Sequence, residues 1–487
     1  MVARAAGGGL NVELSAAREA VKSLALFWSG PPPSGWKYLG DAWERAYGDL
    51  EWKPLDANRV MPWYFLASNG ELTHACGVAT SPSALCHWTV DGNGITLHLD
   101  VRCGGSGVQL GRRRLEVCTV LCRPGRAGET AFAAAQAFCH QMCSRPRLPR
   151  EPVYGFNDWY CAYGNDTADG FLKDTAFLVS LAPKDRNRPF AVIDEGWEER
   201  QPAAKGGQCD MWDHLDPKFS PTLDMPELAR RIRAAGACPG LWYRPLLASP
   251  GQPQEWRLMR DANILDPTVP EVRAYLRRTV QRFRGWHYDL VKHDYTSYDL
   301  LGKWGMEMGA ETTTNGWAFR DRSHTTAEII RGLYLDLRGA AGKETLLLGC
   351  NTIGHLAAGI FELQRVGDDT SGREWDRTRK MGVNSLAFRA PQHGTFFAID
   401  ADCVGQVTAE SVPWDKNKQW LDLVAHSGTP LFASFSPDTV SPAQEQALRS
   451  AYAAASRPQP LAEPLDWQTE CRPTHWRLDG SERRFKW

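Results

Sequence analysis

The sequence has 487 residues, of which 56 are Lys or Arg and 57 are Asp or Glu, so the formal charge at pH 7 is -1. This length exceeds what one ordinary hydrophobic core organises and suits a barrel with an accessory domain. The balanced charge, with no block of Lys or Arg, argues against nucleic acid and anionic membrane surfaces as partners.

The N-terminal stretch MVARAAGGGLNVELS has no apolar run long enough for a signal sequence, and nowhere do about 18 apolar residues follow one another. We therefore expect a cytoplasmic protein, although an export signal trimmed from the chain would leave the same sequence. The 13 cysteines include no C-x-x-C pair and no His partner at zinc spacing. Reduced, buried thiols are expected rather than a zinc site.

Residues 1–148 are predicted to form a β-sandwich domain. LCHWTVDGNGITLHLDVRC (85–103) alternates apolar and polar positions on both sides of a DGNG turn, which is typical of a hairpin with one solvated face. RLEVCTVLCR (114–123) and RVMPWYFLAS (59–68) add short strands, and a sandwich is the natural closure for so many strand edges. GETAFAAAQAFCHQMC (128–143) is predicted to be a helix, and the prolines of SRPRLPREP mark the boundary that follows it.

Residues 149–457 alternate short apolar strands with amphipathic helices, the pattern of βα units around a parallel sheet. Eight strands over roughly 300 residues predict a (β/α)8 TIM barrel in the α/β class. The strands lie near PVYGFNDW, PFAVIDEGW, CPGLWYRP, YDLVKHD, ETLLLGCN, FELQRVGDD, TFFAIDAD and TPLFASF. TIGHLAAGI is short for a crossover helix, so a doubly wound sheet is the alternative. Residues 458–487 are polar, aromatic and rich in turns, and are predicted to form a short C-terminal β segment.

Charged residues fall at the carboxyl ends of the predicted strands, where the site of such a barrel lies. They are Asp158, Asp194, Glu195, Arg244, Lys292, Asp294, Asp368, Asp369, Asp400 and Asp402. A carboxylate there can instead cap a helix or bind a loop amide, and this alternative stays open for Asp158, Asp369 and Asp400. Lys292 would be an expensive neighbour at a buried rim unless it serves a ligand or an ion pair, which favours a functional role for Asp294. His293 points to the opposite side of its strand and is predicted to be a packed, hydrogen-bonded core histidine.

Two kinds of chemistry fit such a ring of acids. Three carboxylates from different strands could hold a divalent metal. Alternatively, two carboxylates could face each other across a sugar, one as nucleophile and one as proton donor, about 5 to 5.5 Å apart in a retaining glycosidase. That second chemistry needs aromatic walls, and the candidates are Trp159, Trp197, Trp242 and Tyr243. The aromatic supply favours the glycosidase.

At these residues the sequence resembles the α-galactosidase clan of glycoside hydrolases, families 27 and 36, and is nearer to family 36. IDEGW resembles the family's D-D-G-W, GLWYRP its G-I-W-x-E-P, and ILDPTVPEVRAYL its L-D-P-x-x-P-E-V-x-x-Y-L. DLVKHDY is similar to its nucleophile strand K-W-D, and VGDDTS to its acid/base strand S-D-D-T-D. The order and spacing of the motifs agree over residues 150–405, so the motifs support one another.

The resemblance implies that Asp294 is the nucleophile and that Asp368 is the general acid/base. Asp369 is the alternative for the second role, because its spacing from Arg365 matches family 27. Lys292 would favour the ionised form of Asp294, as a nucleophile requires. The negative charges of Asp294 and Asp369 would raise the pKa of Asp368 and keep it partly protonated.

The resemblance also implies the contacts of the sugar. Asp194 would accept from the O4 or O6 hydroxyl, Lys292 would donate to O3 or O4, and Cys350 with Gly354 would lie near the 2-position. The full set of expected substrate-binding residues is Asp194, Glu195, Lys292, Trp197, Asp158, Trp159, Trp242, Arg244, Cys350, Arg365 and Asp369.

The sequence departs from the family pattern at four places. His293 replaces Trp, Arg244 replaces Glu, Glu195 replaces the second Asp of D-D-G-W, and CNTIGH stands where family 36 has C-S-G-G-G-R. The last change alters the wall that contacts the substituent at C2. The resemblance therefore supports the catalytic pair more strongly than it supports specificity for galactose. Arg244 could meet a charged or extended substrate, or form an internal ion pair with Glu195. FAIDADCVG resembles the clan's late-strand D-x-D-C and is expected to be structural support.

The expected function is that of a retaining exo-α-glycosidase acting on terminal α-galactosides or C2-modified relatives, with no metal or organic cofactor. Its partner is a carbohydrate substrate, and the family's habit of assembly implies a homo-oligomer. The alternatives are an α-galactosyl transglycosylase of the raffinose-synthase type, a metal-dependent lyase or isomerase on the same barrel, and a catalytically silent carbohydrate-binding relative.

Overall fold

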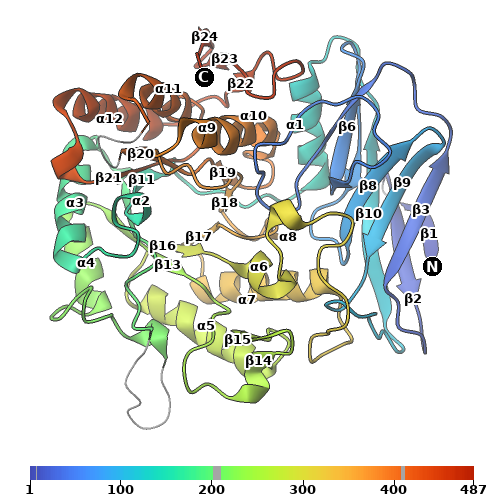
Figure 1. The fold of residues 1–487 in the computed structure, drawn as a ribbon, viewed down its shortest axis with the longest axis horizontal. Coiled ribbons are helices and arrows are strands. Elements are labelled where there is room, and N and C mark those ends of the chain that lie inside the picture. The colour runs from blue at the N-terminus through green and yellow to red at the C-terminus, as the bar shows by residue number, and fades with distance from the viewer. Residues whose placement is uncertain (7, 201–209, 407–411) are drawn as a thin grey trace.

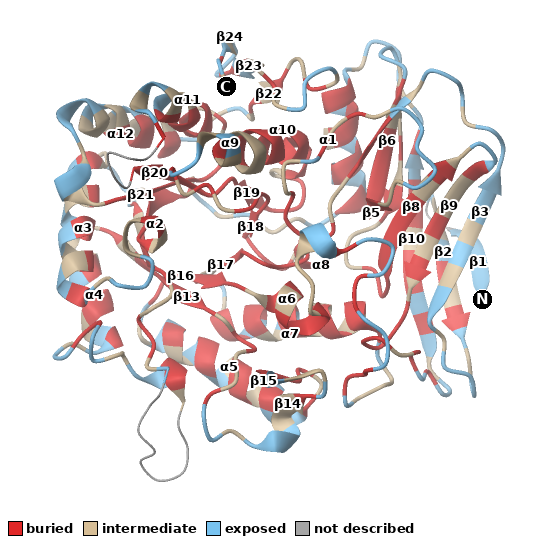
Figure 2. Cartoon of the chain, in the orientation of Figure 1, coloured by how far each residue is buried: buried red, intermediate tan, exposed pale blue. Residues whose placement is uncertain are grey.

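The computed structural model describes residues 1–6, 8–200, 210–406 and 412–487. It contains a two-sheet β-sandwich followed by a parallel barrel and a small C-terminal sheet, and Figure 1 shows the sandwich on the right and the barrel on the left. Most buried hydrophobic residues form one cluster that runs through the sandwich and the barrel, and a second, smaller cluster comes from the barrel strands and their flanking residues (Figure 2). We propose that the sandwich, the barrel and the C-terminal segment divide at 148/149 and 457/458, which fall between elements of secondary structure.

The sandwich consists of two antiparallel sheets, as the sequence predicts. The six-stranded sheet has the order β1 (Val2–Ala6), β2 (Gly9–Ser15), β10 (Arg114–Arg123), β7 (Thr73–Val78), β6 (Tyr64–Ser68) and β4 (Lys37–Gly40). The four-stranded sheet has the order β3 (Ser23–Ser29), β9 (Gly94–Asp100), β8 (Leu85–Asp91) and β5 (Met61–Pro62). The DGNG turn joins β8 and β9, as predicted. The Asp91 carboxylate stabilises the turn by accepting from the backbone N–H groups of Asn93 and Gly94.

The barrel has eight parallel staves at the eight predicted positions. They are β11 (Tyr154–Asn157), β12 (Phe190–Ile193), β13 (Cys238–Tyr243), β16 (Leu290–His293), β17 (Leu346–Gly349), β18 (Leu363–Arg365), the pair β19 (Ala398–Asp400) and β20 (Cys403–Gln406), and β21 (Leu431–Phe435). The last stave, β21, pairs with β11, so the sheet closes and the doubly wound alternative is wrong. The seventh stave is interrupted at Asp402, whose φ is 72°, so that β19 pairs with β18 and β20 pairs with β21.

Amphipathic helices cover the barrel. The longer ones are α3 (Ala168–Leu181), α4 (Met225–Ala235), α5 (Pro270–Gly285), α7 (Thr326–Ala341), α11 (Trp414–Ala425) and α12 (Pro442–Ala455). On α5 the buried residues Val272, Leu276, Val280 and Phe283 recur every three or four positions, which is the stripe that a helix presents to a core. Thr325 and Glu328 form a capping box that fixes the start of α7.

Shorter elements complete the chain. The helices are α1 (Ala131–Met142), α2 (Trp159–Ala162), α6 (Thr296–Leu301), α8 (Gly354–Ala357), α9 (Trp375–Arg377) and α10 (Ser385–Arg389), and a π-helical stretch (Thr378–Asn384) links α9 to α10. The strands are the hairpin β14 (Arg257–Leu258) and β15 (Asp261–Leu265), and the C-terminal sheet β22 (Glu463–Pro464), β23 (His475–Leu478) and β24 (Ser481–Arg484). Every helix in the described ranges is too short or too polar to span a lipid bilayer.

The fifth barrel unit lacks a long helix, and the sandwich packs in its place. Its crossover, α8, is a single turn, in agreement with the weak helical pattern of TIGHLAAGI. His355 of α8 stacks on Trp63 of the sandwich with ring centroids 4.9 Å apart, and its Nε2 lies 3.0 Å from the Val78 carbonyl oxygen. Burial lowers the pKa of His355 to about 3, so the ring is neutral in this joint.

A segment of the sandwich, residues 41–52, extends into the barrel. Ala46 donates its N–H to the Val366 carbonyl at 2.8 Å and accepts from the Asp368 N–H at 3.3 Å, which adds a short parallel bridge beyond the end of β18. Asp41 anchors the start of the segment through a 2.7 Å ion pair with the guanidinium of Arg389, and little of either side chain is exposed. These contacts therefore fix the position of the sandwich relative to the carboxyl end of β18.

The Asp41–Arg389 pair generates a stability prediction. Asp41→Ala leaves the buried Arg389 guanidinium without its counter-ion, so the free energy of unfolding should fall by about 3–5 kcal/mol. Urea denaturation followed by tryptophan fluorescence measures this. The matched control is Arg150→Ala, which removes the exposed pair with Glu344 and should give no measurable change. An Asp41→Ala protein as stable as the control would show that the pair does not hold the segment.

Candidate active site

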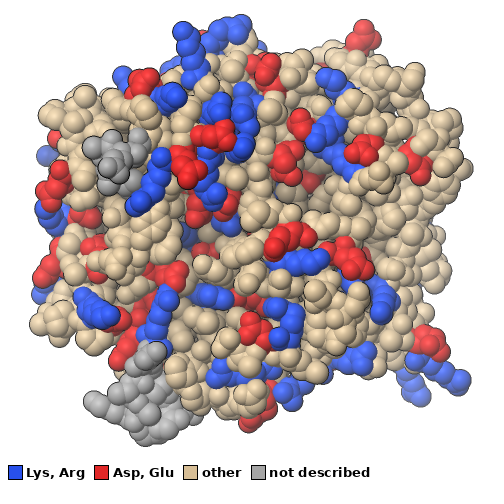
Figure 3. Space-filling view, viewed as in Figure 1, with Lys and Arg blue, Asp and Glu red and all other residues tan. Residues whose placement is uncertain are grey.

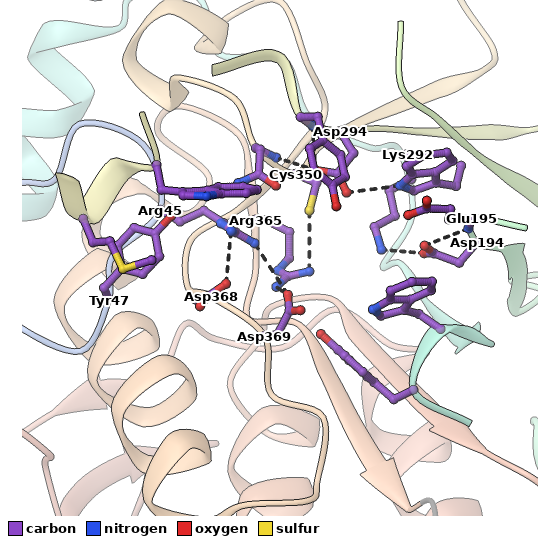
Figure 4. Close-up of a pocket in the computed structure, with 17 residues that line it drawn as sticks. Arg45, Tyr47, Asp194, Glu195, Lys292, Asp294, Cys350, Arg365, Asp368 and Asp369 are labelled. Atoms are coloured by element: carbon purple, nitrogen blue, oxygen red, sulfur yellow. Dashed lines mark hydrogen bonds and ion pairs between the residues drawn. The ribbon is translucent and has the colours of Figure 1, made fainter. Parts of the chain in front are cut away.

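A cavity of about 210 Å³ opens at the carboxyl ends of the barrel staves (Figure 4). This volume lies below the ~300–1,000 Å³ that is typical of pockets for drug-sized ligands, so it suits a single sugar ring. Ten of the residues expected from the sequence line it: Trp159, Asp194, Glu195, Trp242, Lys292, Asp294, Cys350, Arg365, Asp368 and Asp369.

Asp294 follows β16 and is held by donors from three neighbouring strand ends. Its Oδ1 accepts from the Tyr295 N–H at 2.7 Å and from the Asn351 N–H at 3.1 Å. Its Oδ2 accepts from the indole N–H of Trp242 at 3.1 Å. Fixed donors of this kind orient a carboxylate before any ligand arrives.

The environment of Asp294 keeps it ionised. Burial alone would raise its pKa, but the positive charges of Lys292 and Arg45 and the hydrogen bonds from Trp242 and Tyr295 lower the pKa below its ordinary value. A carboxylate in this state can act as a nucleophile. The expectation that Lys292 favours the ionised form therefore agrees with the structure.

Lys292 forms a buried ion pair with Asp194, to the right of Asp368 and Asp369 in Figure 4. Its Nζ donates to Asp194 Oδ2 at 2.6 Å, and the amide of Asn157 donates to the same oxygen at 2.8 Å. Burial lowers the pKa of Lys292, but Asp194 reverses this and raises the pKa well above its ordinary value. This part of the cavity lining thus offers a charged donor and a carboxylate acceptor side by side, the pair that hydroxyl groups of a sugar require.

Two adjacent carboxylates, Asp368 and Asp369, follow β18 and differ in their contacts. Both oxygens of Asp368 face guanidinium groups, Oδ1 that of Arg45 at 3.0 Å and Oδ2 that of Arg377 at 2.6 Å. Asp369 uses only Oδ1, which lies 3.1 Å from Arg365 and 3.6 Å from Arg45. Among the described residues no side chain bonds to Asp369 Oδ2, so this oxygen is available to a ligand in the cavity.

Asp369 is anionic in the unliganded chain. Burial raises its pKa, but the charges of Arg365, Arg45 and Lys292 outweigh burial and bring the pKa to about 2. A proton donor at neutral pH needs a higher value. Any acid role for Asp369 therefore requires proton uptake when a substrate binds.

Asp402, at the interruption of the seventh stave, supports Arg365 from behind. Its Oδ1 lies 2.9 Å from Arg365 Nη1, and its Oδ2 accepts from the Tyr160 hydroxyl at 2.5 Å and from the Thr370 N–H at 2.7 Å. The expectation that FAIDADCVG is structural support is confirmed.

Two side chains of the sandwich, Arg45 and Tyr47, line the cavity although the sequence did not place them there, and Glu44 bonds to Tyr47 beside them. Glu44 is fully buried and accepts from the Tyr47 hydroxyl at 2.6 Å and from the Ser297 hydroxyl. Arg45, only 5% exposed, reaches both β18 carboxylates. With the Asn351 amide oriented to satisfy its neighbours, its oxygen accepts from Arg45 Nη2 at 2.8 Å and its nitrogen donates to Asp294 Oδ1 at 2.6 Å.

Tyr295, Trp304 and Met306 form an apolar part of the cavity lining. Trp304 stacks on Tyr298 with ring centroids 4.4 Å apart and meets Tyr295 at 5.8 Å, and Met306 is 63% exposed beside them. Tyr295 has a left-handed backbone with φ of 64° directly after Asp294, a conformation that costs a non-glycine residue about 1–3 kcal/mol. An apolar, partly exposed lining is suited to the leaving group of a glycoside.

Two predicted aromatic walls belong to the core instead. Trp197 is fully buried, donates its indole N–H to the Trp242 carbonyl at 3.0 Å and packs on Phe283. Tyr243 is fully buried between Trp212 and Phe283. Only Trp159 and Trp242 of the four candidates line the cavity.

Asp158 and Arg244 also lie outside the cavity. Asp158 is buried and accepts from the Asp194 N–H at 2.7 Å, so it fixes the backbone of a cavity residue. Arg244 pairs with Asp299 at 2.7 Å and lies 4.2 Å over the Tyr295 ring. The expected ion pair of Arg244 with Glu195 is wrong, since Glu195 pairs with Arg200.

His293 behaves as predicted. It is buried, its Nε2 bonds to the Thr296 hydroxyl, and its ring packs edge-on against Tyr334 and Phe361. Burial lowers its pKa to about 3, so it is neutral. The replacement of Trp by His at this position therefore lies on the core side of β16 and does not alter the cavity.

Several lining residues were absent from the expectations: Arg45, Tyr47, Tyr160, Tyr295, Trp304, Met306 and Asn351. Asn351 and Tyr295 are direct neighbours of expected residues, so their positions after strand ends could have indicated them. Arg45 and Tyr47 carry no such signal. No group of three or more His, Cys, Asp or Glu side chains within the described ranges is arranged to hold a metal ion.

Solved α-galactosidases resemble this structure over nearly the whole chain. TtGalA from Thermus thermophilus, in complex with p-nitrophenyl α-D-galactopyranoside, has a TM-score of 0.68 at 18% sequence identity, covering 99% of this chain and 95% of that one. A variant of the family 36 enzyme AgaA from Geobacillus stearothermophilus, in complex with raffinose, has a TM-score of 0.57 at 15% identity, covering 92% of this chain and 64% of that one. The galactosidase domain of the α-galactosidase-sucrose kinase AgaSK has a TM-score of 0.56 at 15% identity, covering 93% and 63%. No family model matches the sequence. The chain therefore shares the fold of these α-galactosidases over almost all of its length.

Proposed function

We propose that the protein is a retaining exo-α-glycosidase that hydrolyses terminal α-galactosides or closely related α-glycosides through a covalent glycosyl-enzyme intermediate. The observation that carries the proposal is Asp294. It is an ionised carboxylate with both oxygens fixed by donors, at the base of a cavity the size of one sugar ring. The complexes of TtGalA and AgaA with α-galactosides support the choice of substrate class.

Asp294 is the nucleophile in this mechanism. It attacks the anomeric carbon from the face opposite the leaving group and forms a β-linked ester. Lys292 and Asp194 bind the hydroxyl groups at the far end of the ring, O3, O4 and O6. Trp159 and Trp242 flank the apolar face of the ring. Cys350 and Arg365 line the side of the cavity assigned to C2.

Asp369 is the better candidate for the acid/base, in place of the first choice from the sequence, Asp368. Asp368 is held between Arg45 and Arg377, whose guanidinium groups occupy both of its oxygens. Asp369 keeps Oδ2 available and lies within the reach of Lys292's charge inside the cavity. A sugar bound over Asp369 would displace solvent and favour the protonated form, which then donates to the leaving oxygen. Once the ester has formed, the same carboxylate takes a proton from water.

The nucleophile assignment predicts a large kinetic effect. Asp294→Ala should reduce kcat on p-nitrophenyl α-galactoside by several powers of ten, because no group remains to form the ester. Azide should restore turnover and give a β-azide product, since the small anion enters from the vacated face. Circular dichroism checks that the fold is intact. A variant that keeps more than about one percent of the wild-type rate would contradict the assignment.

The acid/base assignment separates two neighbours. Asp369→Ala should lower kcat/KM for raffinose by about 10²–10⁴, because its sugar leaving group needs a proton. The loss for p-nitrophenyl α-galactoside should be much smaller, since nitrophenolate leaves without one. Azide should accelerate the variant and give an α-azide. Asp368→Ala is the matched control, and at its own pH optimum it should reduce kcat/KM for both substrates by a similar factor. The reverse pattern would assign the role to Asp368.

The sugar and the chemistry can be tested together. Hydrolysis of an α-galactoside should survive prior treatment with EDTA, because the proposed steps use only carboxylates. A panel of α-galactosides, α-N-acetylgalactosaminides and β-arabinopyranosides should show a preference for the galacto configuration at C4, where Lys292 and Asp194 bind. Full loss of activity with EDTA would exclude this mechanism in favour of metal-assisted chemistry.

A further inference from the structure

Arg45 lies between the carboxylates of the site although it belongs to the sandwich (Figure 4). Its guanidinium lies 3.0 Å from Asp368, 3.6 Å from Asp369 and 2.8 Å from the Asn351 oxygen. Through Asn351 it is linked to Asp294, because the amide nitrogen of Asn351 donates to that carboxylate. One buried cation thus contacts the loop that carries the proposed acid/base and, at one remove, the proposed nucleophile.

The position of Arg45 is fixed from both sides. Its neighbour Ala46 forms the backbone bridge to residues 366–368, and Glu44 bonds to Ser297 and Tyr47. Trp43 donates its indole N–H to the Gly309 carbonyl at 3.0 Å and packs edge-on against Trp63. A long side chain on such a segment loses little further conformational freedom when it reaches its partners.

We propose that Arg45 is a positioning residue that acts through Asp369, and that Arg45 with its counter-ion Asp368 sets the pH range over which Asp369 holds a proton. The inference rests on the proposed function, because it assumes that Asp369 is the acid/base. It assigns to the sandwich a direct part in the chemistry of the barrel.

The titratable groups that face Asp369 come from β18, β16, the sandwich segment and α2. Arg365 of β18 and Lys292 of β16 are positive, and both are balanced by their own buried carboxylates, Asp402 and Asp194. Arg45 is balanced by Asp368, which precedes Asp369 in the chain. The Tyr160 hydroxyl of α2 is neutral, since burial raises its pKa well above its ordinary value.

Arg377 completes the arrangement but acts from a different position. It donates to the second oxygen of Asp368 and to the backbone carbonyl of Asp369, and its side chain is 37% exposed. Solvent screens a charge in that position more than it screens the buried Arg45. Arg45 is therefore the cation whose removal changes the field at Asp369 most directly.

Substitution of Arg45 and substitution of Asp368 should change the pKa of Asp369 in opposite directions. Removing the positive charge of Arg45 removes stabilisation of the Asp369 anion, so its pKa rises. Removing the negative charge of Asp368 leaves Arg45 uncompensated beside Asp369, so the pKa falls. Because the first step needs protonated Asp369 and the proton is taken up when substrate binds, kcat declines as pH rises through the pKa of Asp369 in the substrate complex.

The experiment is the pH profile of kcat for raffinose, whose leaving group requires the acid. In Arg45→Gln the basic limb should move up by about one pH unit, and in Asp368→Asn it should move down. Arg45→Lys keeps the charge and should stay near the wild type. An Arg45→Gln profile that is lower at every pH but has the wild-type basic limb would reduce Arg45 to a structural role and overturn the proposal.

The double variant Arg45→Gln/Asp368→Asn guards against loss of folding. It removes both buried charges together and leaves neither unpaired, so it should fold even where a single variant does not. Its basic limb should lie above that of Asp368→Asn, because the two proteins differ only at Arg45. Equal basic limbs in these two proteins would contradict the proposal on a folded background.

A measurement without turnover separates this inference from the proposed function. The infrared carboxyl band that disappears in Asp369→Asn reports the protonation of Asp369 directly, and it should titrate at higher pH in Arg45→Gln than in the wild type. If that shift occurs in a protein with no glycosidase activity, the proposed function fails and the coupling of Arg45 to Asp369 stands. If activity is present and the band does not shift, the coupling fails alone.

Discussion

Two backbone hydrogen bonds between Ala46 and residues 366–368 carry the arrangement of the site. A barrel strand extends only as far as its neighbours pair with it, and β18 has only three residues. The bridge from the sandwich continues that pairing by another step and fixes the backbone from which Asp368 and Asp369 project. Without it, two adjacent carboxylates would sit on an irregular loop, where their distances to Asp294 could not be held to the tolerance that covalent catalysis requires.

The site concentrates charge at low net cost because its buried cations are each paired with a carboxylate. Lys292 is paired with Asp194, Arg365 with Asp402, and Arg45 with Asp368. Isolated, any of these groups would be expelled from a buried wall, whereas the pairs remain and orient one another. On the face shown in Figure 3, basic and acidic side chains are also interspersed, in keeping with the formal charge of -1. The barrel thus presents polar groups in fixed positions to a small cavity, and this preorganisation is the main source of catalytic power in such sites.

The sequence was sufficient for the barrel and for most of its strand-end residues. Apolar runs followed by acids locate the staves, and alternation on β16 correctly separates His293 from Lys292 and Asp294. The sequence could not show that Trp242 lines the cavity whereas Trp197 packs in the core. Trp197 lies beyond the end of β12, where alternation no longer predicts which way a side chain points. The sequence could not place Arg45, which meets its partners across more than three hundred residues of chain and follows no strand of the barrel. The choice between Asp368 and Asp369 likewise depends on which oxygens are already occupied, and that is a property of the folded chain.

The single-turn crossover α8 has a consequence for how this architecture changes over time. In most barrels a full-length helix seals each unit, so an appended module can be lost or exchanged without opening the interior. Here the His355 imidazole of the barrel stacks on the Trp63 indole of the sandwich. The sandwich thus covers the fifth barrel unit in place of a long helix. We therefore expect the sandwich and the barrel to be inherited together. Recombination between relatives would be tolerated at the C-terminal sheet far more readily than at the joint near residue 148.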